Sequence, residues 1–135
     1  SKVFPHLCAA LVGFLGPGFL LLNRPCSLGG RQVGQLTACK SNCKNLATAL
    51  EMYSSDNRGR YPATLDKLTR GNYLKVLPTC PAAGCVTYVY HRSCEPDSFR
   101  FACAGNNHAR AYTGFSTSSN NFPRCNAEEG LLDHP

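Results

Sequence analysis

The stretch that decides the fold is residues 39–53, which read CKSNCKNLATALEMY. Across the wider window 31–54, apolar side chains recur every three or four positions, as they do on one face of an α-helix. This face consists of Val33, Leu36, Cys39, Cys43, Leu46, Ala47, Leu50 and Tyr53. The opposite face carries Ser41, Lys44, Asn45 and Thr48. The pattern predicts one long amphipathic helix that buries its apolar face and ends at the polar turn 54–59.

Shorter elements follow toward the C-terminus. Residues 64–69 predict a short helix with Thr64 as its N-cap, packed against the first helix. Segments 86–90, 99–103 and 109–112 have the alternation and aromatic content of strands, which predicts an antiparallel sheet of about three strands. The tail 116–135 is rich in Ser, Asn and Pro. We therefore expect the tail to be irregular and held to the surface by Cys125.

The apolar run that precedes the helix predicts a membrane anchor. Residues 7–22 carry no charged side chain, and the window 3–23, about 21 residues, is near the length that spans a bilayer. Pro17 interrupts helical hydrogen bonding, so we expect a kink supported by a neighbouring protein. A secretory signal peptide is the alternative, but we expect the segment to be retained. Residues expected in lipid include Leu11, Phe14, Pro17, Phe19 and Leu22. The chain then divides into an anchor at 1–28 and a head at 29–135.

The chain has nine cysteines, more than a reduced cytosolic protein of this size usually carries without metal or redox chemistry. We expect an oxidising compartment, with disulfides as the default role of these residues. Because nine is odd, at least one cysteine has no partner within the chain, and Cys8 is our candidate. Among the sheet cysteines we favour Cys85 with Cys94 and Cys80 with Cys103, although three pairings are open. The disulfide candidates are Cys80, Cys85, Cys94, Cys103, Cys39, Cys43, Cys26 and Cys125.

A thiolate metal site is the alternative use of these cysteines. Its potential ligands are Cys39 with Cys43, Cys80 with Cys85, and either His91 or His108. Neither cysteine pair has the two-residue gap typical of zinc knuckles, so the preferred interpretation assigns no metal and no cofactor. On a helix, Cys39 and Cys43 share one face and could simply be small buried residues.

Composition and motifs point away from several other functions. The formal net charge is +6, but the basic residues are spread along the chain without a cluster, so we predict no nucleic-acid binding. The sequence contains no Cys-x-x-Cys pair, no phosphate-binding glycine loop and no Gly-x-Ser-x-Gly elbow, and we predict no catalytic residue and no enzyme. His6 could ligate a porphyrin-type pigment. We favour the interpretation that His6 lies at the edge of the apolar run and binds no pigment.

Several stretches resemble type IV pilins and pseudopilins. The resemblance is carried by CKNLATALEMY at 43–53, by Tyr61-Pro62 and Tyr73-Leu74, and by PTCP at 78–81. It implies a helical spine with a small globular head, and a role in assembly rather than catalysis. The N-terminus differs from that family, because pilins carry a glutamate near the start of the mature chain and here no acidic residue precedes Glu51.

The preferred interpretation is a non-catalytic, membrane-anchored structural or accessory subunit of the α+β class. An N-terminal membrane helix continues into the amphipathic helix, which packs on a small antiparallel sheet. We expect the pilin-like head in the periplasm or extracellular space. Its expected partners are the lipid bilayer and other membrane subunits or copies of itself. The alternatives are a pilin or pseudopilin subunit of a filament, and a thiolate metal-binding module.

Overall fold

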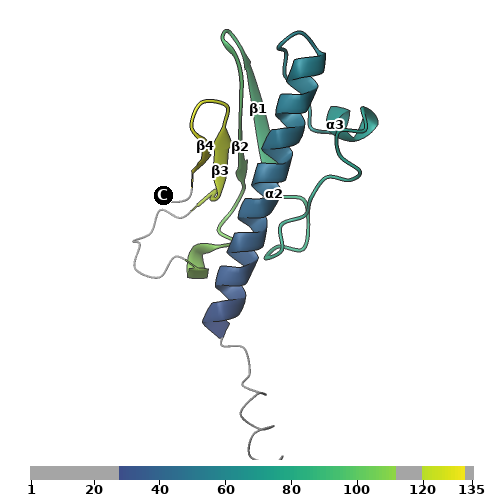
Figure 1. The fold of residues 1–135 in the computed structure, drawn as a ribbon. Helices are drawn as coiled ribbons and strands as arrows, with labels where there is room; N and C mark the ends of the chain where they lie inside the picture. Colours follow the sequence, from purple (N-terminus) through teal and green to yellow (C-terminus); the bar gives the residue numbers. More distant parts are fainter. Residues whose placement is uncertain (1–27, 112–119, 133–135) are drawn as a thin grey trace, which may run out of the picture.

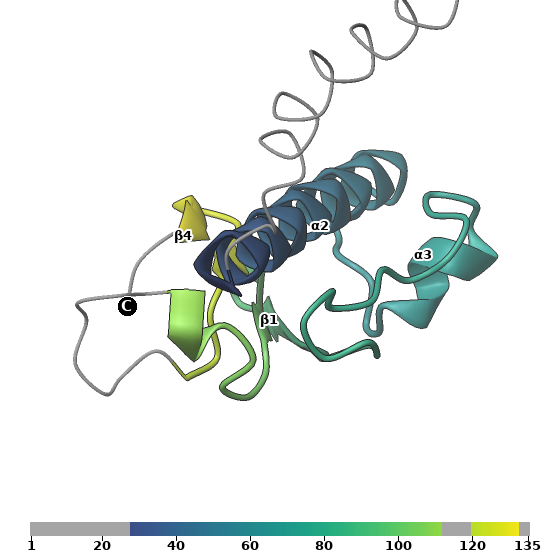
Figure 2. The same cartoon turned by 90° about the horizontal axis from the view of Figure 1, so that it is seen from below.

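The computed structural model describes residues 28–111 and 120–132. Its helices are α2 (Leu28–Asp56), α3 (Asp66–Arg70) and the 3-10 helix η1 (Ala109–Ala111). Its strands are β1 (Tyr88–Cys94), β2 (Asp97–Cys103), β3 (Arg124–Asn126) and β4 (Gly130–Leu132), which form one antiparallel sheet in the order β1-β2-β3-β4. The long helix lies along one face of the sheet, with α3 on one side of it and β3 and β4 on the other (Figures 1 and 2). The predicted α+β class is confirmed.

The predicted membrane segment lies outside the described residues. This applies to Leu11, Phe14, Pro17, Phe19 and Leu22, and also to Cys8 and Cys26. Within residues 28–111 and 120–132, no helix has the length and apolar character needed to cross a membrane.

The amphipathic helix is confirmed and is slightly longer than the predicted window. Its inner face is buried at Leu36, Cys39, Cys43, Leu46 and Leu50. Val33 was predicted on this face but is 51% exposed. With 3.6 residues per turn, Val33 lies about 100° around the helix from the centre of these buried residues, and so it falls outside the buried stripe. The helix stops where the sequence predicted, and Arg58 and Gly59 take positive φ values of 60° and 78°.

The short helix α3 begins at Asp66 rather than at the predicted Thr64. Leu65 occupies the N-cap position and makes no side-chain capping bond. The helix is held instead by Leu68, which is fully buried in the main core. A turn at Gly71-Asn72 follows the helix, with Asn72 at a φ of 60°.

Two predictions for the sheet are wrong. The segment 109–112 is not a strand, because Ala109–Ala111 forms η1, in which the Ala111 N–H donates to the His108 carbonyl at 2.9 Å. The tail is not wholly irregular, because β3 and β4 extend the sheet to four strands. Each of these strands has three residues, too few for an alternating pattern to be visible in the sequence.

The main core lies between the inner face of α2 and the sheet. Its buried members are Cys39, Cys43, Leu46, Ala49, Leu50, Leu65, Leu68, Cys80, Tyr88, Phe99, Phe101, Cys103 and Cys125. Five of these thirteen residues are cysteines. Cysteine is small, so this core contains less apolar side-chain volume than a core built of Leu and Phe.

Leu68 offers a test of this packing. We expect Leu68→Ala to lower the free energy of unfolding by about 2–5 kcal/mol, because it removes a fully buried side chain and leaves a cavity. Urea denaturation followed by circular dichroism measures the change. Val76→Ala is the control, since Val76 is 73% exposed and its truncation should change stability by less than about 0.5 kcal/mol. Equal losses in the two variants would contradict the described core.

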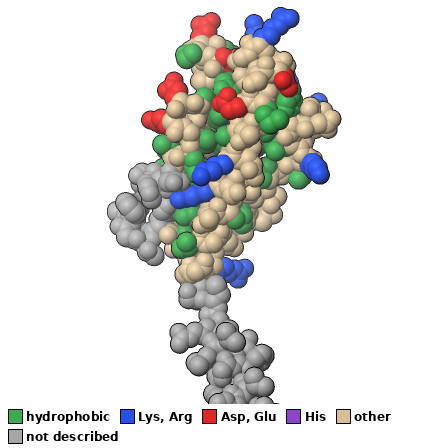
Figure 3. Space-filling view, viewed as in Figure 1, with side chains coloured by type: hydrophobic (Ala, Val, Ile, Leu, Met, Phe, Trp, Pro, Cys, Tyr) green, Lys and Arg blue, Asp and Glu red, His purple; other side chains and the backbone are tan. Residues whose placement is uncertain are grey.

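The surface view shows an uneven distribution of charge. On the face drawn in Figure 3, Asp and Glu side chains gather toward the end of the head where α2 finishes, whereas Lys and Arg side chains are dispersed. This face carries no continuous basic surface.

Candidate metal centre

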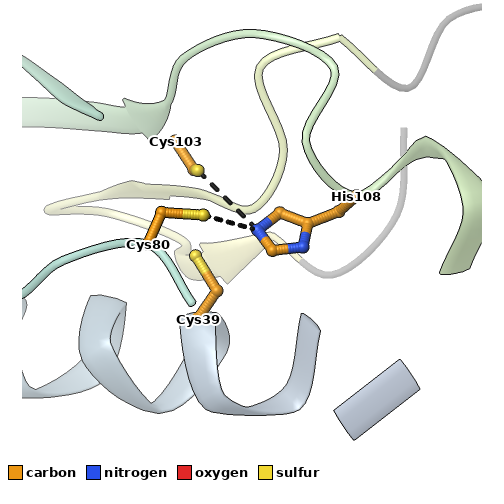
Figure 4. A group of neighbouring side chains, drawn as sticks. All are labelled: Cys39, Cys80, Cys103 and His108. Atoms are coloured by element: carbon orange, nitrogen blue, oxygen red, sulfur yellow. Dashed lines mark hydrogen bonds between the residues drawn. The ribbon is translucent and has the colours of Figure 1, made fainter. Parts of the chain in front are cut away.

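Four side chains from separate parts of the chain meet in the core. They are Cys39, Cys80, Cys103 and His108, and their potential ligand atoms all lie within 4.8 Å of one another. All four residues are buried. Figure 4 shows Cys39 rising from α2 and the sulfur atoms of Cys80 and Cys103 directed at the imidazole ring of His108. The group therefore joins the helix, the loop before β1, the end of β2 and the segment before η1.

The loop that carries Cys80 is fixed to α2 by two amide side chains. Asn42 Nδ2 donates to the Thr79 carbonyl at 2.9 Å, and Gln35 Nε2 donates to the Pro81 carbonyl at 3.2 Å. These bonds hold the residues on either side of Cys80. The loop also closes on itself, because the Cys80 carbonyl accepts from the Gly84 N–H at 2.8 Å. Cys80 is thus positioned by the same helix that supplies Cys39.

Cys103 and His108 are brought together by a tight turn after β2. Gly105 adopts a φ of 94°, which favours glycine. The Gly105 N–H donates to Asn121 Oδ1, and the Asn121 N–H donates to the Gly105 carbonyl, each at 2.8 Å. This reciprocal pair turns the chain back so that His108, five residues after Cys103, faces the Cys103 sulfur.

Two separations within the group are close to those expected of a tetrahedral metal site. Cys80 Sγ lies 3.3 Å from His108 Nε2, and Cys103 Sγ lies 3.8 Å from the same nitrogen. Zinc bonds of about 2.3 Å to sulfur and 2.0–2.1 Å to nitrogen, at tetrahedral angles, separate sulfur from nitrogen by about 3.6 Å. The two observed separations lie on either side of this value.

Polar groups surround the sulfur atoms. The Tyr88 hydroxyl lies 3.3 Å from Cys39 Sγ, and the Thr87 hydroxyl lies 3.1 Å from Cys103 Sγ. Asn107 Nδ2 donates weakly to Cys103 Sγ at 3.9 Å. Three thiolates, one neutral imidazole and one divalent cation have a net charge of −1, and hydrogen bonds donated to sulfur offset the cost of burying that charge. These neighbours suit metal-bound thiolates.

Without a metal, two of the thiols, those of Cys39 and Cys103, have raised pKa values. The contact with Cys103 alone would lower the pKa of Cys39, but the neighbouring Cys43 thiol and burial outweigh it and raise that pKa to about 12. Contact with Cys39 and burial raise the pKa of Cys103 to about 11. Reactive cysteines have lowered pKa values and partial exposure. Cys39 and Cys103 therefore lack the lowered pKa and partial exposure that are typical of reactive cysteines.

The other described cysteines stay outside the group. Cys43 and Cys125 are buried, Cys85 and Cys94 are exposed, and the seven cysteines within the described ranges form no disulfide. The favoured partners Cys80 and Cys103 do lie together, but as members of a set of four. The proposed bond between Cys85 and Cys94 is not formed in this structure.

The metal alternative considered from the sequence grouped its candidate residues differently. It took the sequential pairs, whereas the structure brings together one member of each pair with His108 and leaves out Cys43, Cys85 and His91. It did not include Cys103, which is the fourth member of the group. The available signal was the short interval from Cys103 to His108, a Cys-x-x-x-x-His spacing within the range of natural zinc sites.

Comparisons with known proteins leave the site to be interpreted from its geometry. No protein-family model, curated protein or solved structure matches the chain. The resemblance to pilins therefore depends on the sequence stretches alone.

Tyr88 tests whether the polar neighbours act on bound metal. We expect Tyr88→Phe to weaken zinc binding by about tenfold, because it removes a hydroxyl that faces Cys39 Sγ while keeping the ring that packs against Phe101. Competition with a chromophoric chelator measures the affinity. Tyr90→Phe is the matched control, since the Tyr90 hydroxyl donates to the Pro62 carbonyl. Equal zinc affinities in the two variants would contradict this role of Tyr88.

Proposed function

We propose that the described part of the chain is a non-catalytic structural head closed by one zinc ion, which Cys39, Cys80, Cys103 and His108 bind. The observation that supports this function best is the convergence of four buried ligand atoms, from four separate segments, within 4.8 Å of one another. Four protein ligands fill a tetrahedral shell and leave no position for water or substrate, which is typical of structural rather than catalytic zinc.

The ligand set favours zinc over other metals. Soft thiolates combined with one imidazole suit zinc, whereas calcium and magnesium require oxygen ligands. A four-sulfur iron site would need cysteine in place of His108. Three cysteines and one histidine form one of the common structural zinc sets.

Zinc would supply the stabilisation that the small core lacks. The four ligands span residues 39–108 and connect α2 to the loop before β1 and to the end of β2. In small domains, the free energy of zinc binding contributes directly to folding, because the unfolded chain does not preform the site. The metal then fixes the helix on the sheet at the point where the core is richest in cysteine.

We also propose that this head belongs to a larger membrane-anchored assembly on the exported side, with residues 1–28 as the anchor. The pilin-like stretches support this role, as does the first part of α2, where Val33 is half exposed beside three glycines. Small residues and an uncovered apolar side chain suit close packing against another helix. Detergent extraction of the full chain, followed by mass spectrometry of co-purifying proteins, tests this role. Recovery of the chain without detergent and without partners would contradict it.

Elemental analysis combined with thiol counting tests the zinc proposal. On protein purified without reductant, we expect one zinc per chain, and we expect five described cysteines to react with a thiol reagent only after chelation and denaturation: Cys39, Cys43, Cys80, Cys103 and Cys125. The exposed Cys85 and Cys94 should react in the native protein if they are reduced. Metal-free protein with a bond between Cys80 and Cys103 would overturn the proposal.

A further inference from the structure

The sheet presents a second face that no described helix covers. Figure 2 shows α2 on one side of the sheet and no described helix against the opposite side of β1. The register determines which side chains lie on this outward face. His91 pairs with Arg100 and Arg100 with Asn126, while Val89 pairs with Ala102 and Ala102 with Arg124. Since their neighbours Phe101 and Cys125 are buried, Arg100 and Arg124 point outward.

These outward side chains line a hollow of about 440 Å³. Its cations are Arg100 and Arg124, with His91 beside them, and within residues 28–111 and 120–132 no Asp or Glu lines it. Arg100 and Arg124 are diagonal neighbours across β2 and β3, so their backbones are about 7–8 Å apart, and both side chains line the same hollow. Apolar surface is supplied by Val89, which is 48% exposed, and by Ala102 and Leu132.

One of the two arginines is held in place before any ligand binds. The Arg124 guanidinium stacks on the Phe122 ring at 4.4 Å and donates to the carbonyl groups of Asn121 and Asn120 at 3.1 and 3.3 Å. A positioned guanidinium loses little side-chain entropy when it binds a carboxylate. Arg100 is exposed, and it supplies the second charge.

We propose that this outward hollow binds an acidic segment of a partner protein, which places one carboxylate between Arg100 and Arg124 and an apolar side chain on Val89. The proposal is independent of the zinc site, since none of the four metal ligands lines the hollow.

The shape of the hollow favours a peptide over other anionic partners. Nucleic acid binds through many cations spaced along its backbone, whereas here two arginines converge on one concavity. A bilayer surface needs a protruding basic or apolar surface, and this site is recessed. A carboxylate flanked by apolar side chains matches both the charge and the apolar lining of the hollow.

A titration monitored by nuclear magnetic resonance tests the proposal. The probe is a five-residue peptide that alternates Leu and Glu, added to the isotope-labelled, zinc-loaded full chain in detergent. We expect the amide signals of Val89, Arg100, Ala102 and Asn126 to shift in a saturable way. Arg100→Gln should weaken binding by about tenfold, the effect of losing a charge-assisted hydrogen bond. Arg31→Gln, which removes an exposed charge from the first turn of α2, should leave the affinity unchanged.

The same experiment identifies the outcomes that would overturn the inference. A peptide with Gln in place of Glu should not bind, so equal binding of the two peptides would show that charge is not recognised. Equal losses in Arg100→Gln and Arg31→Gln would show a diffuse effect of net charge. Saturable shifts at these four amides with single-stranded DNA or phosphatidylserine micelles, and none with the acidic peptide, would assign the hollow to another kind of partner.

Discussion

Chelation of zinc is expected to unfold the head. The apparent binding free energy of structural zinc is about 10–16 kcal/mol in small zinc-binding peptides, while the net stability of a domain is about 5–15 kcal/mol. Removing the ion from the Cys39, Cys80, Cys103 and His108 group would therefore remove most or all of the stability of the head. The small, cysteine-rich core between α2 and the sheet has little apolar surface with which to compensate.

Near-ultraviolet circular dichroism, which reports on the packing of the tyrosine side chains, measures this unfolding. We expect a chelator such as EDTA to abolish the near-ultraviolet signal in one cooperative step, and we expect stoichiometric zinc to restore it. Magnesium should not restore the signal, because it does not bind thiolates strongly. A head whose thermal or urea transition is the same with and without chelator would show that zinc does not support the fold.

Replacing a ligand is expected to have the second largest effect, and α2 provides a matched pair for measuring it. Cys39 and Cys43 lie one turn apart on the same helix face, and both are completely buried. Only Cys39 belongs to the metal group. We expect Cys39→Ser to lower the free energy of unfolding by about 4–5 kcal/mol or more, the range reached when a metal site is lost. Cys43→Ser should cost about 1–3 kcal/mol, the cost of a buried hydroxyl with imperfect hydrogen bonding.

Cobalt substitution separates metal binding from general destabilisation in these variants. Cobalt bound by thiolates absorbs in the near ultraviolet in proportion to the number of sulfur ligands. We expect Cys43→Ser to keep the absorption of the parent protein and Cys39→Ser to lose about one third of it or to bind no cobalt, because one of three thiolates is removed. Identical cobalt spectra and identical stabilities in the two variants would remove Cys39 from the site.

The long helix could be predicted from the sequence because its signal is local and repeated. Apolar residues recur with helical spacing over more than twenty positions, and the polar turn at its end contains residues that tolerate positive φ. The exception, Val33, lies about 100° around the helix from the centre of the buried residues, and periodicity alone does not show how wide the covered stripe is. Strands β3 and β4 were missed because three residues carry too little pattern, and they form only through their pairing with β2.

The metal group could not be predicted in full because its members are related by tertiary structure. Cys39 and Cys43 have the same local pattern, and only the position of the loop that carries Cys80 distinguishes them. That position depends on hydrogen bonds from Asn42 and Gln35, residues that lie on α2 but act on a segment about forty positions away. A count of cysteines therefore indicated disulfides or metal, but it could not show which four side chains meet.

A zinc-closed head and an exported, membrane-anchored subunit are compatible proposals with different support. The zinc site is supported by distances, burial and hydrogen bonds among the described residues. The membrane anchor is supported by the composition of residues 1–28 and by the pilin-like stretches. Because the tests use different parts of the chain, the failure of one proposal leaves the other open to its own test.

X-ray absorption at the zinc edge, on the full chain as purified, tests the central claim most directly, because it reports the atoms around the metal. A site made of Cys39, Cys80, Cys103 and His108 predicts three sulfur atoms at about 2.3 Å and one nitrogen at about 2.0–2.1 Å. A shell composed only of oxygen and nitrogen, or a protein that contains no zinc and no free thiol at these three cysteines, would contradict the account.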